Sequence, residues 1–141
     1  MSSASTATIT ALQGALAAEH AAVYGFGVVG SMLSGAGETD ARNAWLSHQS
    51  QRDNLESMLT KLGATPVAAS PAYSLPFPVT NAQSAKRLAA TIEDGLTRAY
   101  LGVVAVNDAT LRTFGARMMQ TSANRATNWS GTTVAFPGMP G

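Results

Sequence analysis

Five long polar side chains have the types and the spacing to form a chemical site inside a helical protein. They are Glu19, His48, Arg52, Glu93 and Arg125. Each lies in or beside an apolar stripe whose members recur every three or four positions, the spacing of a helix face that packs on other helices. A buried carboxylate without a partner is strongly destabilising. The sequence therefore predicts that the two acids find partners among these residues in the core.

A metal centre is one chemistry that these residue types could support. Bundles that hold two metal ions use a Glu from each of two helices and a Glu-x-x-His pair from each of the other two. Glu19 and Glu93 match half of that pattern, but Trp45 stands three residues before His48, and no Asp, Glu or His follows Asp108. The ligand count excludes the usual two-metal site. A mononuclear oxidoreductase that holds one Fe or Mn through Glu19, His48 and Glu93 remains an alternative.

A metal-free salt-bridge network is the interpretation that the sequence favours. Arg52 lies one helical turn from His48 and would repel a metal cation, and arginine offers the forked donors that a buried carboxylate needs. Arg52 and Arg125 are therefore expected to take the place of metal charge. On this hypothesis the protein has no cofactor and no catalytic activity of its own, and acts as a binding or structural protein.

A third alternative is a small-molecule binder whose ligand enters beside Tyr24 and Tyr100. Both tyrosines are expected to place their rings in the core and their hydroxyls on the acids. Close backbone approach is predicted at Gly25, Gly27 and Gly30, either by the proline-rich segment 63–80 or by a second subunit, because glycine is costly inside a helix.

Four helices must position these side chains. The signals at their ends predict a frayed or disordered segment at 1–7 and a first helix that begins between Thr8 and Thr10 and ends before the turn at 34–37. The second helix is predicted to start at Thr39 or Asp40 and to stop at Gly63. The third is predicted to start at a capping box of Thr80 and Gln83, and the fourth to run from a cap at Asp108 to Gly131, with a tail at 131–141.

The segment 63–80 holds four of the six prolines and is too long for a tight turn between helices. Tyr73, Leu75, Phe77 and Val79 alternate with other residues, as in an extended segment that lies on a surface. Its extended length is roughly 55–60 Å, whereas a helix of this size spans roughly 36 Å. The segment can therefore return the chain to the opposite end of a bundle. This predicts an all-α, four-helix bundle with one long crossover between the second and third helices.

Composition limits the other possibilities. The 141 residues fit a single domain, and only 12% are charged, against roughly a quarter in an average protein. So little charge favours a homo-oligomer, with a dimer as the first expectation. No basic cluster indicates nucleic-acid binding, and Glu19 and His20 interrupt the most apolar stretch, which argues against a membrane span. No cysteine and no export signal are present, so a cytoplasmic location is expected.

Four motifs carry a resemblance to a known family: AAEHAAVYGFGVVG, HQSQRD, LPFPVT and the helix around IEDG. Together they resemble the ferritin-like superfamily, and most closely an actinobacterial, alanine-rich ferritin-like domain family of unknown function. The resemblance extends from Leu12 to the AFPG near the end of the chain. It implies a crossover bundle, is compatible with a dimer, and supplies no activity. From the wider superfamily it places Glu19 and Glu93 at ligand positions.

Overall fold

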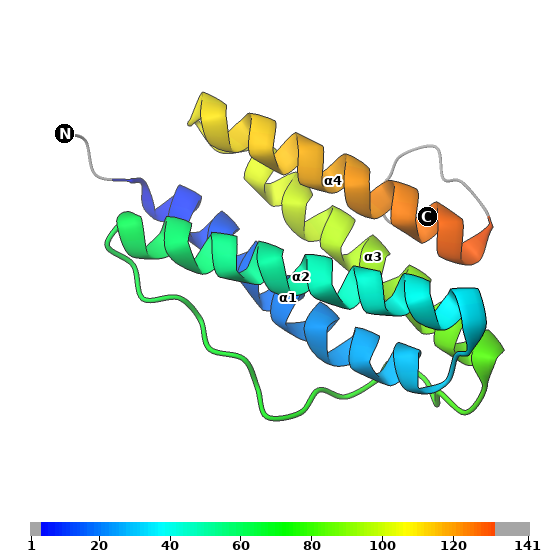
Figure 1. Ribbon diagram of the computed structural model, residues 1–141. Coiled ribbons are helices and arrows are strands. Elements are labelled where there is room, and N and C mark those ends of the chain that lie inside the picture. Colours follow the sequence, from blue (N-terminus) through cyan, green and yellow to red (C-terminus); the bar gives the residue numbers. More distant parts are fainter. Residues whose placement is uncertain (1–3, 132–141) are drawn as a thin grey trace.

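Four helices make up the protein in the computed structural model, which describes residues 4–131 (Figure 1). They are α1 (Thr6–Ser31), α2 (Gly35–Lys61), α3 (Ala82–Val104) and α4 (Ala109–Ser130). No strand occurs among the described residues. The predicted all-α bundle with a long connection between the second and third helices is confirmed. Within 4–131, no helix is apolar over a stretch long enough to cross a membrane.

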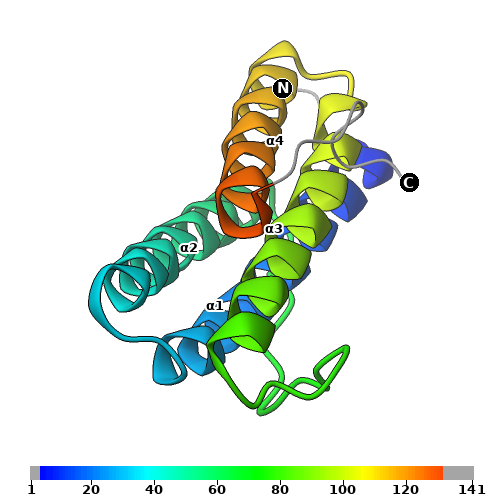
Figure 2. The same cartoon turned by 90° about the vertical axis from the view of Figure 1, so that its right-hand side faces the viewer.

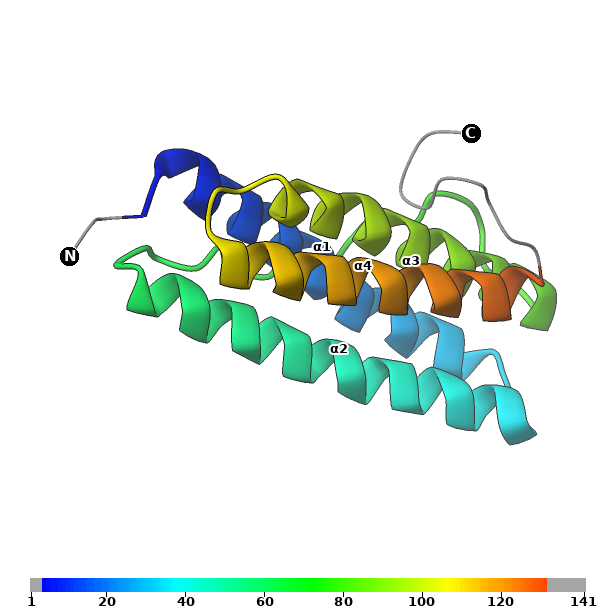
Figure 3. The same ribbon diagram turned by 90° about the horizontal axis from the view of Figure 1, so that it is seen from above.

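The helices are arranged as two antiparallel pairs that meet along α1 and α3. The close-packed pairs are α1 with α2, α1 with α3, and α3 with α4. Helices α2 and α4 diverge on the remaining side, as the end view makes clear (Figure 2). The view from above shows α4 running beside α3, with α2 on its other side (Figure 3).

The helix ends differ in part from those that the sequence predicts. Ser5, not Thr10, caps α1, and its hydroxyl accepts a hydrogen bond from the Thr8 backbone N–H at 3.1 Å. The helix therefore includes Thr6 and Ala7, which were expected to be disordered. Helix α2 begins at Gly35 instead of near Asp40, after an N-cap residue, Ser34, that makes no side-chain capping bond.

The second half of the chain matches its predicted ends more closely. The capping box of α3 uses Asn81 and Ser84, one residue later than predicted. Asp108 caps α4 as predicted, accepting from the Leu111 N–H at 3.0 Å. Gly131 ends α4 with a φ of +74°, which a residue without a side chain adopts at no steric cost. The predicted tail beyond Gly131 lies outside the described residues.

The crossover, residues 62–81, runs along the outside of α1 in an extended form (Figure 1). The Gln13 side chain ties it to α1 by donating to the Thr65 carbonyl at 2.7 Å and accepting from the Val67 N–H at 2.8 Å. Tyr73, Leu75, Phe77 and Val79 are half-buried while the residues between them are exposed. The predicted alternation is therefore confirmed, and the segment lies flat on the bundle.

The apolar core lies mainly between α1, α2 and α3. It contains Leu12, Leu16, Phe26, Leu55, Leu59, Leu88 and Leu96, all at most 2% exposed. Helix α4 buries only small residues, Gly115, Ser122 and Ala126. Its larger apolar side chains are half-buried. Helix α4 is therefore the least enclosed of the four.

The nearest neighbour of Gly25 is Ile92 of α3, not a residue of the crossover. A Cβ at Gly25 would collide with the Ile92 side chain, whereas one at Gly27 would meet open space. One at Gly30 would make ordinary contact with Ala41. Gly25 is therefore the one of the three at which an added side chain would force a neighbour to shift, and that neighbour is the flexible end of the Ile92 side chain.

Candidate functional site

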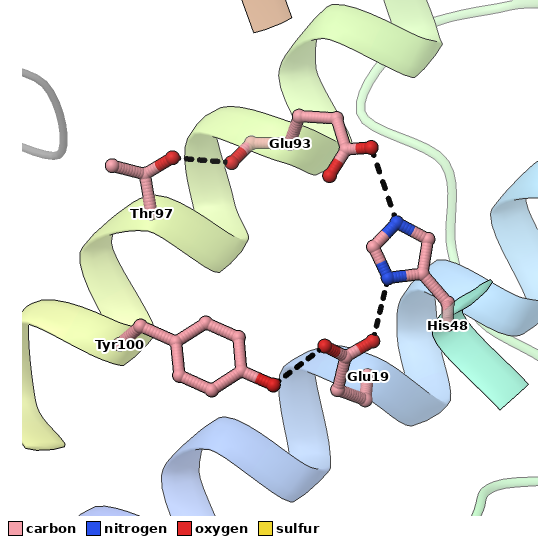
Figure 4. A network of polar contacts seen from close by, with 5 residues as sticks. All are labelled: Glu19, His48, Glu93, Thr97 and Tyr100. Carbon is pink, nitrogen blue, oxygen red and sulfur yellow. Dashed lines mark hydrogen bonds and ion pairs between the residues drawn. The ribbon is translucent and has the colours of Figure 1, made fainter. Parts of the chain in front are cut away.

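A histidine held between two glutamates forms the centre of the bundle. The Nδ1 atom of His48 lies 2.7 Å from Oε2 of Glu19, and its Nε2 atom lies 3.1 Å from Oε2 of Glu93 (Figure 4). The three residues come from α2, α1 and α3, and each is at most 1% exposed. An ionised carboxylate can only accept hydrogen bonds. Both ring nitrogens of His48 therefore donate, and the ring is an imidazolium.

The proton on His48 is held by its surroundings. Burial lowers the pKa of His48, but the hydrogen bonds to Glu19 and Glu93 and the charges of both outweigh it and raise the pKa from 6.5 to about 9. The network therefore contains a fixed positive charge between two acids at neutral pH.

Two further residues of α3 complete the network. The Tyr100 hydroxyl donates to Oε1 of Glu19 at 2.7 Å, and the Thr97 hydroxyl donates to the backbone carbonyl of Glu93 at 2.8 Å (Figure 4). Burial and the nearby charge of Glu19 raise the pKa of Tyr100, so its hydroxyl keeps its proton. The Oε1 atom of Glu93 is buried and makes no hydrogen bond. Glu19 is thus fully partnered, and Glu93 only in part.

Aromatic rings join this network to the α2–α4 side of the bundle. The Phe26 ring stacks on the His48 ring, with 5.3 Å between their centroids. The indole of Trp129 lies on Phe26, with 6.1 Å between centroids. Tyr100 meets Phe114 edge-on at 5.9 Å. His48 is therefore shielded from water by apolar rings.

The geometry tests whether Glu19, His48 and Glu93 could share a metal ion. A metal ligand must offer a deprotonated nitrogen, whereas both nitrogens of His48 carry protons that bond to carboxylates on opposite sides of the ring. Among residues 4–131, no group of three or more His, Cys, Asp or Glu side chains is arranged to hold a metal ion. The residues present do not fit the metal that the wider superfamily implies.

The expectation that Arg52 pairs with the buried acids is wrong. Its side chain is 28% exposed and bonds to Asp53, with Nη2–Oδ1 at 2.9 Å. A weaker contact reaches Glu56 at 3.8 Å. Asp53 and Glu56 on the same helix thus bind Arg52 at the surface, where its guanidinium stays hydrated. This avoids the free energy needed to desolvate the charge in the core.

Arg125 acts on the network only through its charge and not through a bond. It makes no hydrogen bond or ion pair in the part of the chain that the structure describes, and it is half-buried on α4. Its charge nevertheless acts on Tyr100, where it opposes the rise in the pKa of that hydroxyl. The predicted direct bond between Arg125 and a buried acid is therefore absent.

The two tyrosines expected to flank a ligand lie apart. Tyr100 is 1% exposed and belongs to the network. The Tyr24 ring packs on Tyr73 of the crossover, 5.5 Å between centroids, and is half-buried. Tyr24 therefore belongs to the outer face of α1 and is not part of the same site.

The sequence pattern did not indicate the buried polar groups of Thr97 and Gln51 or the aromatic contacts of His48. Thr97 is buried and follows Glu93 by one helical turn, which is the only signal that could have revealed it. Gln51 follows His48 by three positions and has a buried, unpartnered Oε1 atom, so it lies closer to the core than Arg52 does. The stacking of Phe26 on His48 and the tilted contact of Trp129 with Phe26 depend on contacts between helices that no local pattern encodes.

The fold and the site together define a class of protein: an all-helical crossover bundle with a carboxylate–imidazolium–carboxylate network in its core. Within that class, the chain belongs to the family described as "Domain of unknown function (DUF4439)", whose model matches residues 11–141. No curated protein matches the chain.

A solved structure supports the same assignment. The crystal structure of a conserved hypothetical protein, rv2844, from Mycobacterium tuberculosis is similar to this chain, with a TM-score of 0.87 and 34% sequence identity. The match covers 92% of this chain and 98% of the mycobacterial one. The similarity therefore spans the whole bundle.

Proposed function

We propose that the protein is a ferritin-like bundle that has replaced a metal centre by a proton-carrying network, and that it acts as a binding or structural protein instead of an oxidoreductase. The observation that carries this proposal is the engagement of both His48 nitrogens by Glu19 and Glu93, at 2.7 and 3.1 Å. With its proton, the imidazolium supplies inside the core the positive charge that a metal ion supplies in a carboxylate-rich bundle.

The chemistry of the site also argues against catalysis. Glu19, His48 and Glu93 are each at most 1% exposed, and the Phe26 ring stacks on His48, so a substrate has no open path to the network in this conformation. A general acid or base must reach the proton that it transfers. His48 shares its protons only with two fixed carboxylates and is therefore suited to holding the three helices together.

A cytoplasmic homodimer is the assembly that we propose for this bundle. The charged fraction of 12% is low for a monomer of 141 residues. Leu46, at 48% exposed, and Met32, at 39%, are apolar groups that a second copy could cover.

Native mass spectrometry tests the metal and the assembly in one experiment. The protein is loaded anaerobically with Fe(II), Mn(II) or Zn(II), freed of excess ions, and weighed intact. We expect the mass of two chains without bound metal. Glu19→Ala is measured beside Glu38→Ala, an exposed acid at the start of α2 that serves as a control. One ion retained per chain, and lost only in Glu19→Ala, would establish the mononuclear alternative in place of this proposal.

A further inference from the structure

Helices α2 and α4 diverge on one side of the bundle (Figure 2). A groove with a mixed polar and apolar lining lies between them. Its volume is about 270 Å³, which suits a ligand smaller than the drug-sized molecules that occupy roughly 300–1,000 Å³. Asp40, Asn43 and Ser47 line it from α2, and Arg125, Asn128 and Trp129 from α4. None of the network residues lines it, so the groove is a separate place in the molecule.

Arg125 is the residue of this groove that could bind a ligand, because its guanidinium is half-buried and makes no bond to another residue of 4–131. Other arginines of the described chain are satisfied in recognisable ways. Arg112 donates to the Val106 and Asn107 carbonyls, and Arg87 lies 4.1 Å above the Phe77 ring. Arg117 is exposed, so its guanidinium is accessible to water. Arg125 alone combines partial burial in a groove with the absence of any bonded partner in residues 4–131.

The rest of the lining limits which anion can pair with Arg125. A guanidinium binds a planar carboxylate through two parallel hydrogen bonds. The Trp129 indole gives the groove an apolar wall, and the amides of Asn43 and Asn128 can bond to a carboxylate oxygen. Asp40 also lines the groove, and its charge repels an anion the more strongly the more negative charges the anion carries, which disfavours phosphate and dicarboxylates relative to a monocarboxylate. A monocarboxylate with an apolar body matches all of these features.

We propose that the α2–α4 groove binds a small organic monocarboxylate, with Arg125 pairing with the carboxylate and Trp129 packing against the apolar part. This inference deepens the proposed function and rests on it, since it names the ligand class of a bundle that binds and does not catalyse. The ring stack from Trp129 through Phe26 to His48 places the ligand against the core without exposing the network.

Trp129 itself reports on the groove. The chain has two tryptophans, so the Trp45→Phe protein contains a single indole, in the groove wall. Phenylacetate is titrated into this protein while the fluorescence of Trp129 is followed, and phenylacetamide, its neutral counterpart, is titrated in parallel. We expect saturable binding of phenylacetate that is at least about tenfold tighter than that of phenylacetamide, because a charge-assisted bond is lost in the latter.

Two variants on the same helix identify the anchor. Arg125→Gln should weaken phenylacetate binding at least about tenfold, whereas Arg117→Gln, an exposed position on α4, should leave it unchanged. Inorganic phosphate should not displace phenylacetate. Equal binding of phenylacetate and phenylacetamide, no binding of either, or efficient displacement by phosphate would each overturn the inference, and these measurements need no variant at Arg125.

Measuring the metal content of the same samples shows whether a negative result contradicts this inference or the proposed function. A protein that holds no metal and does not bind phenylacetate would contradict the groove proposal alone. A protein that retains one ion per chain, lost in Glu19→Ala, would contradict the proposed function whatever the groove binds.

Discussion

The two hydrogen bonds of His48 make its proton part of the structure. Glu19 and Glu93 each lose a charged partner when the ring deprotonates, and both acids are at most 1% exposed. A buried carboxylate cannot recover the lost bond from water. The cohesion of α1, α2 and α3 at this level therefore depends on the protonation of one side chain.

This dependence predicts a stability that falls at alkaline pH. The folded pKa of about 9 lies above the unfolded value of 6.5, so the stabilisation is complete below about pH 6.5 and is lost as the pH rises through 9. The difference corresponds to about 3 kcal/mol of unfolding free energy. Urea unfolding of the protein at pH 6 and at pH 9.5 should show a loss of this order.

Two variants distinguish the effect of His48 on the pH dependence of stability from the effect of the surface charges. His48→Gln removes the titrating group and should flatten the decline, whereas Arg52→Ala should keep both the decline and nearly the parent stability, because Arg52 bonds only to Asp53 and Glu56 at the surface. If His48→Gln does not fold, NMR titration of the parent follows the two histidines directly. A His48 ring that titrates near pH 6.5 would contradict the prediction.

At the scale of single residues, the spacing identified the two acids and the imidazole correctly, but it wrongly assigned Arg52 to them as a partner. The buried positions of α2 include His48 and Leu55, and both Gln51 and Arg52 lie between them on the edge of that face. Periodicity cannot choose between such neighbours. Arg52 lies at the surface because Asp53 and Glu56 stabilise its charge there without removing its hydration.

At the scale of elements, the packing of α4 against α3 requires the two backbones to lie close together at Gly115. A Cβ at Gly115 would lie 3.0 Å from the Val103 Cβ and 3.0 Å from the Val104 backbone nitrogen. The backbone atom cannot move aside as a side chain can. The absence of a side chain at Gly115 therefore sets the distance between these helices.

Alanine substitution tests this contact. Gly115→Ala should destabilise the protein by about 1–3 kcal/mol through overpacking, despite the higher helix propensity of alanine. Gly102→Ala, at an exposed site of α3 where a Cβ meets open space, should instead stabilise it by up to about 1 kcal/mol. Thermal unfolding of both variants gives the comparison. An unchanged melting temperature in Gly115→Ala would show that α4 tolerates displacement.

The number and order of the elements followed from the sequence, while the starts of two helices did not. Loop lengths and the proline-rich segment sufficed for the crossover bundle. The start of α1 was placed too late because Ser5 precedes several other residues that could equally serve as caps. The start of α2 was placed too late because Ser34 makes no side-chain capping bond, so the helix begins without the signal that Asp40 offered.

At the scale of the whole molecule, the helices are unequally supported. Helix α1 packs against both α2 and α3, and α3 packs against both α1 and α4, while α2 and α4 each have one close neighbour. Opening of a helix costs more free energy when it exposes more buried apolar side chains. The bundle should therefore open first along its α2–α4 side.

Amide hydrogen exchange measures this order. The central amides of α1 and α3 should exchange most slowly, and those of α4 fastest among the helices, because α4 buries only Gly115, Ser122 and Ala126. Saturation with phenylacetate, if the groove binds it, should slow exchange around Arg125 more than around Gly115. Exchange in α4 as slow as in α1 would contradict the unequal support inferred here.

The crossover has a consequence for how the chain assembles. Because residues 62–81 form the one long connection in 4–131, each helix hairpin, α1–α2 and α3–α4, consists of residues that are near one another along the chain. Contacts between near neighbours close small loops and form rapidly, whereas docking of the two hairpins must close a long loop once. We therefore expect the slow step of folding to be the docking of α1 against α3, in which Glu93 first reaches His48.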